Sequence, residues 1–209
     1  MENNKGFINW NISAGKWLYN FLILQVLFIV FTLKGGILFG IFPSIASLFN
    51  ILYKWIAFDR YDLSILKEFK AFYKGNFWET NKLGFLMLGI GMFLTFDLYV
   101  SSVFIKSILL HIVLVLFFLV FSAVLVYLFP VFARYQLKKM DYLKQAFFIS
   151  LGSIVETIAA LLSIVVVSYV FMYIPFLFMF FGVPLLLGPI AWFTIQGMEK
   201  IEAVKMKDS

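Results

Sequence analysis

The sequence contains no cysteine, a single histidine and little charge, and each shortage excludes a class of function. Without cysteine there are no disulfides, thiolate metal sites or cysteine nucleophiles. With only His111, the His-Glu-x-x-His zinc motif is absent. The chain also lacks the phosphate-binding Gly-x-x-x-x-Gly-Lys pattern and the Gly-x-Ser-x-Gly nucleophile elbow. We therefore expect neither an enzyme nor a cofactor or metal site.

Apolar residues dominate what remains. They make up 63% of the 209 residues, against 13% charged residues, and the mean hydropathy is +0.98. A soluble core of this size could not cover so much apolar surface, so the bilayer is the expected solvent. We predict an all-α polytopic membrane helix bundle of about six transmembrane helices, forming one integral membrane domain over 1–209. The apolar runs are 17–39, 43–58, 83–100, 107–133, 146–173 and 175–196.

The basic residues predict the orientation of these helices. With six crossings and both ends in the cytoplasm, only Lys34 and Lys106 of the 17 basic residues lie outside. This is the positive-inside pattern, so the net charge of +6 indicates topology and contact with anionic lipid rather than nucleic-acid binding. A five-crossing alternative leaves 43–58 on the surface. In either topology, 16 helical residues span only ~24 Å, so 43–58 could be re-entrant.

Two charged and aromatic stretches separate the apolar runs. In residues 59–82, apolar residues recur at helical spacing, with lysines filling the other face: Leu63, Leu66, Phe69, Phe72 and Tyr73 against Lys67, Lys70 and Lys74. This pattern predicts an amphipathic helix at the membrane surface. Residues 134–145 are a shorter stretch of the same kind. Interfacial anchoring and docking of a cytosolic partner both remain open for these stretches.

Ionisable and amide side chains within the apolar runs are the candidate site residues. Glu156, Gln25, Asn50 and Asn20 fall at comparable depth in the inner leaflet on three different helices. Such residues are costly in lipid and usually have a partner or a function. We predict a polar cluster around Glu156, which is either a titrating site for a proton or solute or a set of hydrogen bonds that join helices.

Other features indicate local structure. Asp97 and Lys106 lie at the expected outer ends of two runs, where a salt bridge is the simpler expectation. The sixth run contains Gly182, Pro184, Gly188 and Pro189, which predicts an interrupted helix. Interrupted helices bind substrates in some transporters, but proline kinks are also ordinary in membrane helices.

One segment resembles a known family. Residues 40–49 (GIFPSIASLF), followed by Lys54-Trp55, resemble the signature of the YesL family of bacterial membrane proteins. Tyr73, Phe77, Asn81 and Gly84 fit its continuation into the next helix. The resemblance covers residues 17–90, and Ser44 and Ser47 stand where alanine is more usual.

The resemblance implies a role rather than a reaction. The family has no established activity, and its members are often encoded beside genes for oligosaccharide uptake and breakdown. We therefore expect a non-enzymatic protein of the cell membrane that assists carbohydrate uptake, with sugar transporter subunits as partners. An autonomous carrier or channel for small solutes or ions, using Glu156, is the alternative.

Overall fold

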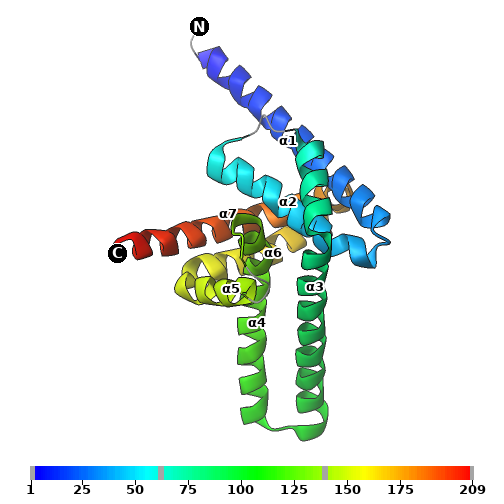
Figure 1. Ribbon diagram of the computed structural model, residues 1–209, viewed down its shortest axis with the longest axis vertical. Helices are drawn as coiled ribbons and strands as arrows, with labels where there is room; N and C mark the ends of the chain where they lie inside the picture. Colours follow the sequence, from blue (N-terminus) through cyan, green and yellow to red (C-terminus); the bar gives the residue numbers. More distant parts are fainter. Residues whose placement is uncertain (1–2, 61–63, 138–140, 208–209) are drawn as a thin grey trace.

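The computed structural model describes residues 3–60, 64–137 and 141–207, with side chains described from Gly15 onward except those of residues 205 and 207. Helices joined by short turns make up these residues (Figure 1). The elements are α1 (Asn3–Lys34), α2 (Leu38–Phe58), α3 (Ile65–Val100), the π-helix η1 (Ser101–Ile105), α4 (Ile108–Arg134), α5 (Asp141–Gly152), α6 (Ile154–Tyr173) and α7 (Pro175–Lys207).

Six helices in the described residues are long and apolar enough to cross a membrane, namely α1 to α4, α6 and α7. The predicted all-α polytopic architecture is therefore confirmed, and the chain is a multi-pass membrane protein in a lipid bilayer.

The first turn lies at Gly35–Ile37, and α2 is longer than the sequence predicted. Gly36 has a φ of +74°, and the Ile37 and Gly36 N–H groups bond to the Thr32 and Leu33 carbonyls. This is the Schellman pattern that ends many helices, and glycine adopts its left-handed position without strain. Because α2 starts at Leu38 rather than Pro43, its 21 residues reach ~31 Å. The length on which the re-entrant alternative for 43–58 depended, 16 residues and ~24 Å, was therefore wrong.

The surface helix expected over 59–82 is also wrong. From Ile65 onward it is the first half of α3, one unbroken helix of 36 residues; Leu63 lies outside the described residues. Two of its apolar positions are covered by protein, since Phe69 and Tyr73 pack against the Phe31 ring of α1 at centroid distances of 5.2 and 5.0 Å, whereas Leu66 is exposed. The helical period was right, but protein covers part of the apolar face.

Two later elements also differ from expectation. The fifth apolar run is divided, because α5 ends at Gly152 and α6 starts at Ile154, with Ser153 between them. The sixth run, by contrast, is one continuous helix, α7, with Pro184 and Pro189 inside it. A side chain of α1 supports α7 near the first proline, as described below.

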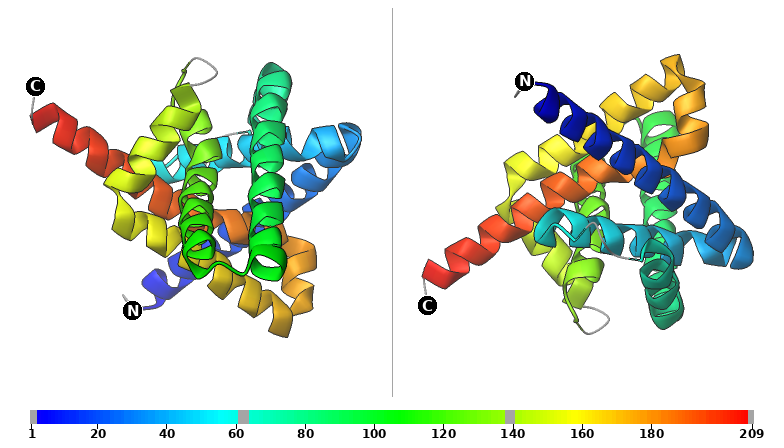
Figure 2. Two further views of the ribbon diagram at one scale, coloured as in Figure 1. Left: turned by 90° about the horizontal axis from the view of Figure 1, so that it is seen from below. Right: turned by 90° about the horizontal axis from the view of Figure 1, so that it is seen from above.

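Some of the spans run side by side, and others cross one another. Figure 1 shows α3 and α4 as a long hairpin that projects from the rest, with α7 lying across it. Seen along the long axis, α1 and α7 cross one another (Figure 2). The centre is α2, which contacts α1, α3, α4 and α7. Its Trp55, together with Phe69 of α3 and Tyr127 of α4, is among the largest fully buried side chains.

Candidate functional site

The residues that carry the family resemblance form the junction of α1, α2 and α3. Gly40 lets α2 touch α1, because a Cβ there would lie 2.2 Å from the Thr32 carbonyl oxygen. Pro43 has no N–H to donate to the carbonyl four residues earlier, that of Phe39. The Asn81 side chain of α3 supplies the missing donor, with Nδ2 at 2.9 Å from the Phe39 oxygen.

Tyr73 and Gly84 complete this junction. The Tyr73 hydroxyl donates to the Phe31 carbonyl near the end of α1 at 3.0 Å. Gly84 lies against the ring of Phe42, where a Cβ would come within 2.2 Å of a ring carbon. The family pattern is therefore a packing device: a glycine for close approach, a proline, and side chains that satisfy the carbonyls left open.

A buried hydroxyl cluster lies at the break between α5 and α6. The Tyr127 hydroxyl of α4 is 3.0 Å from Ser153 Oγ and 3.4 Å from Thr157 Oγ1. Thr157 Oγ1 also donates to the Ser150 carbonyl at 2.8 Å. Gly197 of α7 packs on the cluster, since a Cβ there would lie 2.6 Å from the tyrosine oxygen. The cluster gives the Ser150 carbonyl a donor at the break between α5 and α6, and it joins these two helices to α4.

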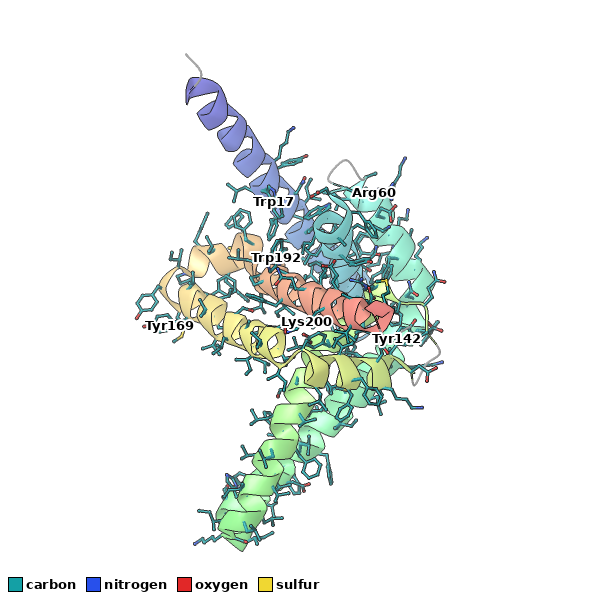
Figure 3. The ribbon with its side chains drawn as sticks, turned by 90° about the vertical axis from the view of Figure 1, so that its left-hand side faces the viewer. Trp17, Arg60, Tyr142, Tyr169, Trp192 and Lys200 are labelled. Carbon is teal, nitrogen blue, oxygen red and sulfur yellow. The ribbon has the colours of Figure 1, made fainter. Side chains whose placement is uncertain are left out.

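Glu156 pairs with Lys200, which the sequence indicated only as one of the basic residues that predict topology. Its Oε1 accepts from the Lys200 ammonium of α7 at 2.9 Å, while Oε2 is buried without a hydrogen-bond partner. The side chain of Glu156 is 16% exposed and that of Lys200 52%. Figure 3 shows α6 and α7 side by side, with Lys200 on the half of α7 nearer the C-terminus.

Gln25 bonds to α7 far from this pair. Its Oε1 accepts from the Val183 N–H at 3.0 Å, and its Nε2 donates to the Met179 carbonyl at 3.5 Å. These two backbone groups are the ones that pair with each other in a regular α-helix. The amide therefore lies within the hydrogen-bond ladder of α7, one residue before Pro184, and supports the helix there.

The four predicted site residues do not form one cluster. The backbone and side-chain partners of Gln25 and Glu156 on α7, Val183 and Lys200, are 17 positions apart, or ~25 Å along the helix. Asn50 is 5% exposed in α2 with Nδ2 lacking a hydrogen-bond partner, and Asn20 is half-buried on α1. Sequence depth was a poor guide because some of the spans cross one another.

A second ionic group, missed in the sequence, joins α4 to the end of α7. The Arg134 guanidinium binds the Glu202 carboxylate, stands over the Tyr53 ring at 5.5 Å and lies 4.0 Å from Glu199. The Tyr135 hydroxyl donates to the other Glu202 oxygen. Burial, followed by this hydrogen bond and the glutamate charge, raises the pKa of Tyr135 far above its usual range. Two glutamates three positions apart, Glu199 and Glu202, were the feature of the sequence that could have indicated this ionic group.

The expected pair at the hairpin tip does not form. Asp97 and Lys106 are both described and make no ion pair with one another. His111 lies nearby on α4 with a buried Nδ1 that lacks a hydrogen-bond partner.

Chemically, these groups hold helices together. Each set described above joins two or three helices. Over the ranges that the structure describes, no three acidic or histidine side chains gather closely enough to hold a metal ion. A hollow of about 300 Å³ between α1 and α7 has an apolar lining: Trp17, Leu18, Phe21, Leu177, Phe181 and Leu185.

In a comparison with known proteins, the part of the chain that matches a protein family contains the junction of α1, α2 and α3. A family model described as "Protein of unknown function, DUF624" matches residues 21–98, which run from α1 into α3 and include the junction. The uncharacterized Bacillus subtilis (strain 168) protein YteU is 32% identical over 82% of this chain and 77% of its own length. Two more uncharacterized proteins of that organism are similar: YesV at 30% identity, over 86% of this chain and 87% of its own, and YesL at 27%, over 88% of both. No solved structure matches. The chain therefore belongs to the DUF624 family of YesL-like membrane proteins, a family of unknown function.

Proposed function

We propose that this protein is a non-enzymatic component of the cell membrane that assists an oligosaccharide transporter by contact with one of its subunits. The carbohydrate part of the proposal rests on the expectation from the YesL resemblance. The contact part rests on one observation: exposed lysines recur along the outward face of the first half of α3, beside the exposed Trp78. Such a face is available to another protein.

The surface we propose for contact is the outward face of the first half of α3. We define the lysine stripe as Lys67, Lys70, Lys74 and Lys82, four exposed lysines that recur along this face, with Trp78 between the last two. Trp78 is 67% exposed, an exposure typical of an aromatic side chain available to a partner. Charge complementarity makes an acidic cytoplasmic surface of a transporter subunit the partner that fits.

Affinity purification of the tagged protein from mild-detergent membranes, with mass spectrometry, tests this proposal. We expect transporter subunits to co-purify, and Lys67→Glu with Lys74→Glu to release them. Lys16→Glu with Lys144→Glu is the matched control, because it reverses the charge of two exposed lysines outside the stripe. Phe69 and Tyr73 are buried, so changing them would test folding rather than docking. Purification without transporter subunits would contradict the proposal.

A small-solute carrier is the second candidate, and the unpartnered Glu156 Oε2 is the observation that favours it. If Glu156 titrates during transport, Glu156→Gln abolishes pH-dependent flux in liposomes made with the pure protein. Flux by wild-type protein alone would support the carrier over the accessory role. Equal flux in the variant would remove Glu156 from the mechanism.

A further inference from the structure

A small polar hollow lies at the tip of the α3–α4 hairpin. Its volume is about 290 Å³, and its lining is Ser101, Ser102, Lys106, Ser107, Ile108 and His111. The chain turns back here through η1 and Lys106, whose φ is +54°. The helices on either side expose mainly apolar side chains, such as Phe96 and Leu109. The three serines, the lysine and the histidine of the hollow therefore form a polar site in apolar surroundings.

The start of α4 lines this hollow through Ser107, Ile108 and His111 and has free backbone donors. Ser107 occupies the N-cap position, where a serine hydroxyl commonly accepts from the first turn, but it makes no such bond. The first intrahelical bond runs from the His111 N–H to the Ser107 carbonyl at 3.0 Å. The N–H groups of 108–110 therefore have no partner within α4. The positive end of a 27-residue helix favours an anion at this point.

A buried side chain supplies independent evidence of a ligand. Ser101 lines the hollow and is 1% exposed, yet its Oγ has no hydrogen-bond partner. Its Oγ could have donated to the Asp97 carbonyl, the usual partner of a helical serine. His111 also lines the hollow, and its buried Nδ1 lacks a partner. Buried polar atoms usually have a hydrogen-bond partner, so these two atoms, which line the same hollow, are open to a ligand.

We propose that this hollow binds one oxyanion of the phosphate class. The Lys106 ammonium supplies the charge, and the Ser101 hydroxyl and the first-turn N–H groups of α4 donate to the phosphate oxygens. Asp97, the acidic residue nearest in the sequence, is not among the lining residues. The phosphate is either the headgroup of a phospholipid or a free ion. The hollow shares no residue with the lysine stripe, so the test of phosphate binding is independent of the proposed accessory role.

The first arm of the test uses inorganic phosphate as the probe. The full chain, purified in a neutral detergent, is titrated with phosphate by calorimetry. Loss of a charged donor predicts that Lys106→Gln weakens binding about tenfold, and loss of one hydroxyl predicts that Ser101→Ala weakens it severalfold. Lys34→Gln is the matched control, because Lys34 is the other lysine expected outside and lines no part of this hollow. Saturable binding with this pattern supports the site with a free ion as ligand.

The second arm uses lipid. The same variants are placed in nanodiscs of phosphatidylcholine with or without phosphatidylglycerol, and retained lipid is measured by native mass spectrometry. Retention of phosphatidylglycerol that Lys106→Gln and Ser101→Ala reduce, without binding of inorganic phosphate, supports a headgroup site. The proposal is wrong if neither probe binds, or if binding is unchanged by both variants or equally reduced by Lys34→Gln. Ser101→Ala removes one oxygen, so it keeps the test valid if Lys106→Gln fails to fold.

Discussion

At the scale of single residues, a side-chain amide replaces the backbone donor that a proline removes. The Phe39 carbonyl receives its bond from Asn81 because Pro43 cannot give one. We predict that Asn81→Leu lowers the free energy of unfolding by ~1–3 kcal/mol, the usual cost of an unsatisfied buried carbonyl. Thermal unfolding in detergent would measure it.

Restoring the proline's missing N–H provides the control. In a Pro43→Ala background, residue 43 can donate to Phe39 itself, so Asn81→Leu is expected to cost clearly less there. Equal costs in both backgrounds would show that the two residues do not share this carbonyl.

Tyr135 gives a residue-scale prediction for alkaline pH. Because folding raises its pKa, the neutral phenol contributes stability that is fully present below about pH 10. That contribution is lost as pH rises above the unfolded value toward the raised folded value. Tyr135→Phe should therefore show a smaller loss of stability than wild type between about pH 9 and 11, measured by chemical unfolding. Parallel pH curves for both proteins would argue against a raised pKa of Tyr135, and so against its burial beside Glu202.

Only part of this residue-scale detail could be predicted from the sequence. Glu156 and Gln25 stood out because each is polar in an apolar run. Their partners, Lys200 and the α7 backbone at 179–183, are 44 or more residues away in the chain. A single sequence does not show such long-range pairings, so Lys200 was counted only among the basic residues that predict topology, and Glu202 was not singled out.

At the scale of elements, glycine sets how closely helices approach. A Cβ at Gly40 would lie 2.2 Å from a backbone oxygen of α1, which cannot rotate away as a side chain can. Gly40→Ala is therefore expected to force α1 and α2 apart and to cost ~3 kcal/mol or more of stability. Gly75→Ala is the control, because nothing lies within 4 Å of its added Cβ. It should stabilise α3 by up to ~1 kcal/mol, and similar unfolding temperatures for both variants would contradict the close approach.

The element predictions succeeded where composition decides and failed where packing decides. Apolar runs of sufficient length were found correctly as spans, since the bilayer requires them. The period of residues 65–82 was also found, but amphipathicity does not say whether the apolar face meets lipid or protein. Likewise, Pro184 and Pro189 predicted an interruption, but α7 is continuous, and Gln25 bonds to its backbone just before Pro184.

At the scale of the whole molecule, the positive-inside pattern makes a topology prediction that the absence of cysteine makes simple to test. Single cysteines at positions 34 and 106 should react with a membrane-impermeant maleimide in intact cells, whereas one at position 74 should react only after lysis. A cysteine at 34 that is protected until lysis would overturn the orientation with both ends in the cytoplasm. The crossing of some of the spans, in contrast, could not be predicted from charge counts, because it arises from the side-chain packing around α2.

The Gln25 bonds also bear on how the chain is made. Synthesis runs from α1 to α7, so the Gln25 amide is complete long before Met179 and Val183 exist. Until then it faces lipid or the insertion machinery without its final partners, and α7 lacks the support of Gln25 ahead of Pro184 until it meets α1. Two helices far apart in the order of synthesis, α1 and α7, therefore bond to one another only late in synthesis. Nascent chains that stop before α7 should be recognised as unfinished and degraded by quality-control proteases.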